Sequence, residues 1–292
     1  MTSELKGRTF VITGANSGIG LAAARTLGGR GARVVMAVRD TAKGEKAAAT
    51  VPGEHEVRQL DLADLASIHA FADAWSGDID VLVNNAGIMA VPEARTKDGF
   101  ESQLGTNHLG HFALTNLLLP RITDRVVSVA SGAHRLGRVD LDDLDFAKRG
   151  YDRWRVYGQS KLANLLFIAE LQRRFDEAGS PLRAMAAHPG YAATNLQSHT
   201  GSTLQNLLMT VGNAVLAQSE ERGSEPTVYA ATEDIPGNSY VGPDGFLEQR
   251  GKPKLVGRSK AAQDADMARG LWAASERLTG VTSGLTSAPS RA

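Results

Sequence analysis

The chain has 292 residues, of which 42% are apolar and 22% charged, the balance of a globular protein long enough for one large domain or two smaller ones. Its 32 basic and 32 acidic side chains cancel, so no excess charge favours nucleic acid or a charged membrane surface. The absence of cysteine excludes disulfide scaffolds, thiolate metal sites and a cysteine nucleophile.

The N-terminal ten residues contain Glu4, Lys6 and Arg8 and no apolar stretch of secretory length, so no signal peptide is expected. The richest apolar run, at 162–171, is broken by polar residues and is far shorter than the ~20 residues that span a bilayer. We therefore expect a cytoplasmic protein with no transmembrane segment.

Short aliphatic runs alternate along the chain with longer helical patterns. Several runs are continuously apolar, as a parallel sheet covered by helices on both faces requires. The expected strands are 8–13, 33–38, 57–60, 79–83, 125–130 and 182–187. The expected helices are 18–30, 41–49, 64–75, 98–119, 156–177, 204–218, 220–231 and 259–278. This order predicts a doubly wound α/β fold of the Rossmann type.

No internal repeat and no long linker divides the chain, so we expect a single domain over residues 1–278. Residues 132–154 are rich in charged side chains and predict an inserted surface loop with solvated acids at 140–145. Residues 279–292, rich in Gly, Ser, Thr and Pro, are expected to fray.

The first expected strand runs through a glycine-rich turn directly into a helix. Glycines at 14, 18 and 20 let the backbone turn tightly and approach a pyrophosphate, whose charge the helix N-terminus stabilises. A glycine turn alone is a weak signal, and its G-x3-G-x-G spacing differs from the commoner G-x-G-x-x-G. No Lys-Ser or Lys-Thr follows it, so it is not a P-loop.

Polar groups also follow the later strands. Asn84-Asn85-Ala86-Gly87 ends the fourth strand, and Ser131 follows the fifth. Tyr157 and Lys161 are four residues apart and share one face of the next helix. An isolated pair of this kind is more often a half-buried aromatic beside a surface lysine, but here the pair follows the other motifs in order.

Together with Pro189-Gly190 after the sixth strand, these motifs resemble the short-chain dehydrogenase/reductase family over residues 6–194. The long interval from Ser131 to Tyr157 and the residues at 157–166 are similar to the retinol dehydrogenases, protochlorophyllide reductases and WW-domain oxidoreductases. The resemblance implies hydride transfer between NAD(P) and a small-molecule carbonyl or alcohol, and it allows a homo-oligomer. It also implies that Asn107 is the active-site Asn that holds a water linking Lys161 to solvent.

The residues suit this chemistry. A free Tyr, with a pKa near 10, is only about one part in a thousand ionised at pH 7. The cation of Lys161 and an oxidised nicotinamide would favour tyrosinate, and lowering the pKa by roughly 3 takes about 4 kcal/mol. We therefore expect Tyr157 to be the general acid/base, Lys161 to orient the ribose and tune Tyr157, and Ser131 to hold the substrate oxygen.

The end of the second strand, Arg39-Asp40, bears on the choice of cofactor. An acid there binds the ribose 2′-OH of NAD, whereas an Arg pairs with the 2′-phosphate of NADP. Arg39 matches the NADP-type position of the family it resembles, and Asp40 is placed to cap the next helix. We expect NADP, with NAD as the alternative, although Asn16 stands where many NADP-binding members carry a basic residue in the turn.

By the same resemblance, Asp61-Leu62 contacts the adenine and Thr194 reaches the nicotinamide amide. The expected cofactor-binding residues are Gly14, Asn16, Ser17, Gly18, Ile19, Gly20, Arg39, Asp61, Leu62, Asn84, Ala86, Gly87, Tyr157, Lys161, Pro189, Gly190 and Thr194.

Apolar residues at 204, 207, 208, 211 and 215 have helical spacing, which an amphipathic helix packed on the core would also show. We expect residues 195–218 to form a movable lid over an apolar pocket, and the substrate to be lipophilic. A retinoid, a steroid-like ketone and a long-chain aldehyde all remain open.

The sequence supports other functions less well. His108 and His111 are three residues apart, but no carboxylate stands at zinc-site spacing, so no metal is expected. Ser131 and His134 lack the Gly-x-Ser-x-Gly turn of a hydrolase, and His188 is expected to be structural. A Rossmann methyltransferase has no use for Tyr157 and Lys161. A non-catalytic NAD(P)-binding sensor or scaffold of the same fold is the main alternative.

Overall fold

The computed structural model describes residues 4–190 and 219–285. Within them, eight strands form one sheet in the order β3-β2-β1-β4-β5-β6-β7-β8, and each neighbouring pair is parallel except β7 and β8. The strands are β1 (Thr9–Thr13), β2 (Arg33–Val38), β3 (His55–Gln59), β4 (Ile79–Asn84), β5 (Ile122–Val129), β6 (Arg183–Ala187), β7 (Tyr240–Pro243) and β8 (Pro253–Leu255).

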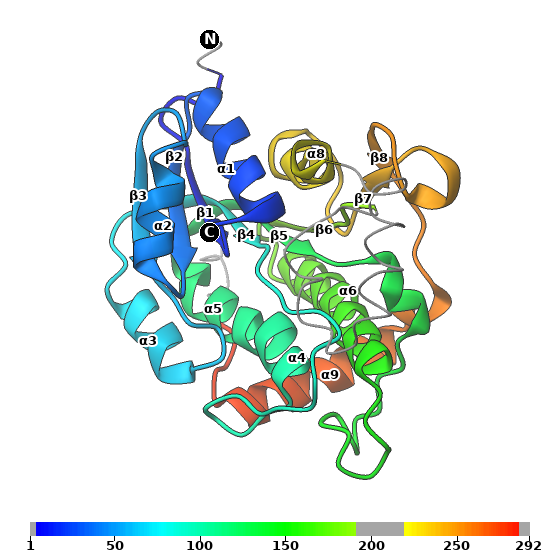
Figure 1. The fold of residues 1–292 in the computed structure, drawn as a ribbon. Coiled ribbons are helices and arrows are strands. Elements are labelled where there is room, and N and C mark those ends of the chain that lie inside the picture. Colours follow the sequence, from blue (N-terminus) through cyan, green and yellow to red (C-terminus); the bar gives the residue numbers. More distant parts are fainter. Residues whose placement is uncertain (1–3, 191–218, 286–292) are drawn as a thin grey trace, which may run out of the picture.

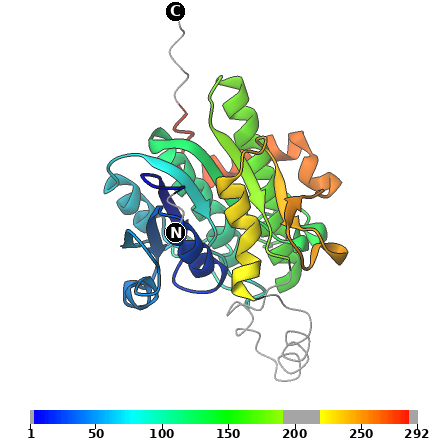
Figure 2. The ribbon, with the colours of Figure 1, turned by 90° about the horizontal axis from the view of Figure 1, so that it is seen from above.

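Helices cover both faces of this sheet (Figure 1). On one face lie α1 (Gly18–Gly29), α2 (Thr41–Ala48) and α8 (Glu220–Thr232). On the other lie α3 (Leu65–Asp73), α5 (Gly110–Leu118), α6 (Arg153–Glu177) and α9 (Ala265–Thr279), with the short α4 (Ser102–Leu104) leading into α5. Figure 1 shows α8 and α9 on opposite sides of the sheet, and Figure 2 shows the molecule from above, with α8 towards the viewer.

The central strands are apolar on both sides because both sides are covered. Phe10 and Ile12 of β1 belong to the core beneath α1, whereas Val11 between them belongs to the core beneath α5 and α6. All three are fully buried. The strands are thus continuously apolar because helices cover both faces of the sheet, as predicted. The predicted single-domain, doubly wound α/β fold is confirmed.

Several element boundaries were wrong. Strands β7 and β8 were not expected, since they have only four and three residues and contain Gly242, Pro243 and Pro253. The helix expected from residue 98 begins at Ser102, after a bridge between Arg95 and Glu101, and the Glu101 carboxylate caps it.

The segment expected at 259–278 is two helices. A 3₁₀ helix (Lys260–Gln263) comes first, and Asp264 then caps α9 by accepting from the backbone N–H of Met267. The third expected strand begins at His55, two residues before the predicted start. The helix expected from residue 156 begins at Arg153.

The insertion at 132–154 is not simply a surface loop. It opens with a 3₁₀ helix (Gly132–Leu136), and its Leu144 and Phe146 are buried. Asp143, expected to be solvated, is also buried and accepts hydrogen bonds from the backbone and guanidinium of Arg149. The insertion therefore packs against the domain.

The expected fraying does not begin at Thr279. Helix α9 includes that residue, and Val281 is buried in the core beneath α5 and α6. The expected lid at 195–218 lies outside the described residues. Of the helices that the structure describes, none combines the length and the apolar character needed to span a bilayer.

The sheet order places a switch point between β1 and β4. The chain passes from β1 outward to β2 and β3, then returns to β4 on the other side of β1 and continues outward to β5. In doubly wound sheets, ligands bind beyond the carboxyl ends of the strands at such a point. The glycine turn follows β1 and Asn85-Ala86-Gly87 follows β4, so both lie at this edge.

We predict that truncating Trp272 strongly destabilises the fold. Its indole stacks on Phe167, meets Phe112 edge-on with ring centroids 4.9 Å apart, and lies under the guanidinium of Arg174. Trp272→Ala should lower the free energy of unfolding by about 3–5 kcal/mol in urea denaturation. Leu278→Ala, on the same helix but exposed, should change it by less than about 0.5 kcal/mol. Equal losses in the two variants would contradict this packing.

Candidate active site

The glycine turn brings the ends of β1 and β4 into contact. Gly14 has a φ of +66°, which favours glycine, and a Cβ there would lie 2.9 Å from the Cβ of Ala86. A Cβ on Gly20 would lie 2.4 Å from Nδ2 of Asn85 and 2.7 Å from the carbonyl oxygen of Gly14. The turn therefore packs closely against the residues that follow β4, which leaves no room for a side chain at position 14 or 20.

Helix α1 begins directly after this turn. Ser17 is its N-cap residue, but the Ser17 side chain makes no capping hydrogen bond, and the first turn carries no acidic side chain. The first N–H groups of a helix have no partner within it, and they carry the positive end of its dipole. Together with the glycines at 14 and 20, this end of the helix fits the pyrophosphate of a dinucleotide.

Arg39 and Asp40 differ in their surroundings. Asp40 caps α2 by accepting from the backbone N–H of Lys43 at 3.0 Å, as the sequence predicted, and its other oxygen lies 3.4 Å from Nζ of Lys43. These contacts lower the pKa of Asp40. Arg39 is exposed and forms no ion pair or hydrogen bond with other described residues. The acid is thus engaged in its own helix, whereas the guanidinium is available.

The other expected cofactor residues flank the same edge. Asp61 accepts from the backbone N–H of Ala63, and buried Leu62 packs with its carbonyl against Gly110. Asn84 donates to the Thr115 hydroxyl. In the glycine turn, Asn16 is half-buried, Gly18 has a φ of +57°, and Ile19 is buried.

On the other side of the site, Pro189 follows β6, and Gly190 has a φ of +68°. Thr194 lies outside the described residues.

Ser131 and Tyr157 are brought together by two glycines. A Cβ on Gly137 would lie 2.3 Å from the carbonyl oxygen of Gly158, so the 3₁₀ helix that follows Ser131 packs directly against α6. Ser131 lies close enough to the Tyr157 hydroxyl to lower the pKa of that hydroxyl. Ser131 Oγ accepts from the backbone N–H of Ala133, which leaves the serine proton free to be donated.

Lys161 lies one helical turn after Tyr157 and is buried. Its Nζ donates to the carbonyl oxygen of Val129 at 2.9 Å and lies 5.8 Å from the centre of the Tyr157 ring. Burial lowers the pKa of Lys161 to about 8. Burial raises the pKa of Tyr157 to about 12, although the neighbouring Ser131 acts in the opposite direction. At neutral pH the protein alone thus holds a protonated Tyr157 beside a mostly charged Lys161.

Asn107 occupies a π-helical turn (Gly105–Leu109) between α4 and α5, a distortion often found at functional sites. Its side-chain oxygen accepts from the backbone N–H of Ile88, and its Nδ2 donates to the Ile88 carbonyl and to Ser160 Oγ. A Cβ on Gly87 would lie 3.0 Å from Oδ1 of Asn107 and 3.4 Å from Nζ of Lys161. The end of β4, Asn107 and Lys161 therefore meet.

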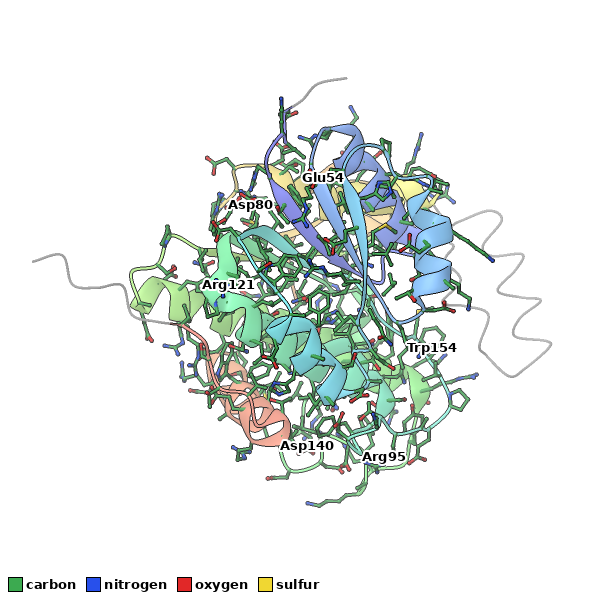
Figure 3. All side chains as sticks on the ribbon, turned by 90° about the vertical axis from the view of Figure 1, so that its left-hand side faces the viewer. Glu54, Asp80, Arg95, Arg121, Asp140 and Trp154 are labelled. Atoms are coloured by element: carbon green, nitrogen blue, oxygen red, sulfur yellow. The ribbon has the colours of Figure 1, made fainter. Side chains whose placement is uncertain are left out.

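Sequence reasoning missed two neighbours of this cluster. His111, considered only as a metal ligand, bonds to Thr13 and to the Asn107 carbonyl. Trp154, one turn before Tyr157 and labelled in Figure 3, meets the Tyr157 ring edge-on at 6.4 Å. It was missed because it stands at the end of the expected loop 132–154, two residues before the expected helix, whereas α6 begins at Arg153 and includes it. No group of metal-ligating side chains is found among the described residues.

His134 and His188 have structural contacts. Nδ1 of His134 lies 2.7 Å from the Ser131 carbonyl oxygen, and Nε2 accepts from the backbone N–H of Ser259. His188 accepts from the backbone N–H of Gly190 and packs on the ring of Tyr240. These contacts hold the segments after β5 and β6 in place.

Comparison with known proteins agrees with this arrangement. The family model for short chain dehydrogenases matches residues 8–205. Human retinol dehydrogenase 13 is 40% identical over 96% of this chain and 86% of its own length. Mouse polyprenol dehydrogenase is 39% identical over 95% of this chain and 85% of its own.

Solved structures share the fold. An uncharacterised protein from Mycobacterium paratuberculosis is 56% identical and superposes with a TM-score of 0.85 over 98% of this chain and 99% of its own. A short chain dehydrogenase from Burkholderia cenocepacia, crystallised with NADP, is 20% identical with a TM-score of 0.64 over 81% of this chain and 96% of its own. The chain belongs to the short chain dehydrogenase family, in the subgroup of the retinol dehydrogenases, and is an NAD(P)-dependent oxidoreductase.

Proposed function

We propose that this protein interconverts a lipophilic carbonyl compound and its alcohol with NADP(H), using Tyr157 as the general acid/base. The observation that carries the proposal is the buried pair of Tyr157 and Lys161, with the half-buried Ser131 next to Tyr157, beside the cradle at the ends of β1 and β4. A nucleotide-binding scaffold would gain nothing from burying a lysine and a tyrosine together at this edge.

The nicotinamide, when bound, supplies or accepts the hydride. The Ser131 hydroxyl donates a hydrogen bond to the substrate oxygen, where negative charge develops during reduction. The Tyr157 hydroxyl then gives its proton to that oxygen, and in the oxidative direction it takes the proton back. The cation of Lys161 stabilises the tyrosinate formed in reduction. Because burial keeps Tyr157 protonated, the protein alone is poised for reduction.

We predict that Tyr157→Phe abolishes turnover but keeps cofactor binding. The variant removes only the hydroxyl, so folding and the glycine cradle should be unchanged. Loss of acid/base catalysis should lower kcat by about 10²–10⁴-fold, measured as NADPH oxidation with an active carbonyl substrate. Ser131→Ala should also lower kcat more than NADPH affinity. A Tyr157→Phe enzyme near wild-type activity refutes the mechanism, and a wild type inactive on a broad panel favours the sensor or scaffold.

The preference for NADP rests on the contrast between Arg39 and Asp40. Asp40 already accepts a backbone hydrogen bond and faces Lys43, whereas the exposed Arg39 has no described partner. A guanidinium recognises a phosphate by charge-assisted hydrogen bonds. This arrangement supports recognition of the 2′-phosphate by Arg39.

We predict that Arg39→Ala weakens NADPH and spares NADH. The lost charge-assisted pairing is worth about 1.5–3 kcal/mol, which is roughly 10- to 150-fold in Kd. The binding of each cofactor can be measured by fluorescence titration. Lys46→Ala removes an equal charge from the exposed side of α2 and should leave both affinities nearly unchanged. Equal wild-type affinities for NADPH and NADH would contradict this preference and indicate instead that Asp40 binds the ribose 2′-OH.

The lipophilic substrate is supported by Trp154 and by the relatives. Trp154 is half-buried, with its ring beside that of the proposed catalytic tyrosine, where it can contact apolar parts of a bound substrate. The relatives include proteins named for retinol and for polyprenol, both long apolar alcohols.

We predict a clear preference for long apolar carbonyls over short polar ones in a panel followed by NADPH oxidation. Trp154→Ala should raise KM for the apolar members by about 10-fold, because removing one aromatic contact costs about 1.5 kcal/mol. The short polar members are the internal control and should be affected less. Preference of the wild type for short polar substrates, or an equal change across the panel, would exclude a lipophilic site at Trp154.

A further inference from the structure

His111 lies in α5, one helical turn after Asn107, and is fully buried. Its Nδ1 is 3.0 Å from the carbonyl oxygen of Asn107, and its Nε2 is 2.9 Å from Oγ1 of Thr13. Thr13 is the last residue of β1, directly before the glycine turn. One imidazole ring thus joins the backbone of the proposed active-site Asn to the start of the cofactor cradle.

The partners of the ring fix its tautomer. A carbonyl oxygen can only accept, so the hydrogen must be on Nδ1, and Nε2 must accept from the Thr13 hydroxyl. Thr13 Oγ1 itself accepts from the backbone N–H groups of Asn85 and Ala86, both at 2.9 Å, which leaves its own proton for His111. Burial lowers the pKa of His111 to about 4, so the ring is neutral.

The bridge reaches both parts of the site. Through Thr13 it is bonded to the Asn85-Ala86 backbone, whose Ala86 packs against Gly14. Through Asn107 it is connected to Ser160, the neighbour of Lys161 on α6. The Thr13 proton has no alternative acceptor closer than the Val83 carbonyl at 3.4 Å. Without His111, a buried hydroxyl would lose its acceptor and a buried carbonyl would lose a donor.

We propose that His111 is a positioning residue that holds the cofactor cradle and the Asn107–Lys161 side of the site in register through a neutral, Nδ1-protonated ring. This inference rests on the proposed function, since register matters only where the cofactor and Tyr157 act on one substrate. Displacement of reacting groups by about 1 Å can cost on the order of 100-fold in rate. Loss of the bridge is therefore expected to affect kcat more than cofactor affinity.

His108, on the preceding turn, is a matched control. It is equally buried, but its Nε2 bonds to Ser275 Oγ of α9, away from the cradle. The Ser275 hydroxyl donates to the Leu271 carbonyl, so it accepts from His108, whose hydrogen must therefore be on Nε2. The two histidines are thus expected to be opposite tautomers on neighbouring turns.

The first test does not depend on activity. ¹⁵N NMR of the histidine-labelled full chain at pH 7 distinguishes protonated from bare ring nitrogens, and His111→Phe and His108→Phe assign the two signals. We expect an Nδ1–H tautomer for His111 and an Nε2–H tautomer for His108. An Nε2–H tautomer or a charged ring at His111 would overturn the bridge, whatever becomes of the proposed reaction.

The second test uses turnover. His111→Phe keeps an aromatic ring without hydrogen bonds and should lower kcat by about 10- to 100-fold, with a smaller change in the Kd of NADPH. His111→Gln, which retains one donor and one acceptor, should recover part of the loss. His108→Phe should keep wild-type kcat. Wild-type kcat in His111→Phe, equal losses in both Phe variants, or no recovery by Gln would overturn the positioning role.

The two proposals fail differently. If Tyr157→Phe retains activity, the proposed function fails, whereas the NMR result still decides whether the bridge exists. If Tyr157→Phe is inactive and His111→Phe is fully active, the reaction stands and the positioning role of His111 is wrong.

Discussion

The close approach of the backbone at the ends of β1 and β4 is the constraint on which the site depends. Gly14 lies against Ala86, and the Thr13 hydroxyl accepts hydrogen bonds from the backbone N–H groups of Asn85 and Ala86. A side chain at position 14 would push the two strands apart where the sheet reverses its strand order. This contact places the glycine turn beside the end of β4, and Gly87 then lies next to Asn107 and Lys161.

Features set by local chemistry could be predicted from the sequence. The central strands were predictable because burial on both faces demands continuous apolar runs, and the cap at Asp40 because a short acid before a helix satisfies its first N–H groups. The proximity of Tyr157 and Lys161 follows from their spacing of four on one helix. The cluster with Ser131 was inferred by resemblance, and its geometry depends on the close packing of Gly137 against Gly158.

Features set by distant contacts could not be predicted. The partner of His111 is 98 residues away along the chain, and that of His108 is 167 residues away. Their spacing showed only that they lie on neighbouring turns, not which one faces the site. Strands β7 and β8 are too short to show a pattern, and they form by pairing with β6 and with each other. Asp143 looked solvated because its partner, Arg149, lies within the same irregular segment.

The burial of Lys161 in the candidate site lowers the stability of the folded protein. It is buried with a carbonyl oxygen as its hydrogen-bond acceptor, and no described carboxylate forms an ion pair with it. Its pKa falls from an ordinary 10.5 to about 8, which costs the folded state about 3 kcal/mol. Since the folded pKa is the lower one, this cost is fully present below pH 8 and disappears as the pH rises towards 10.5. A buried apolar side chain would carry no such cost at neutral pH. In the proposed mechanism the cation stabilises the ionised form of the tyrosine beside it, a role that accounts for a buried lysine that the packing of α6 does not require.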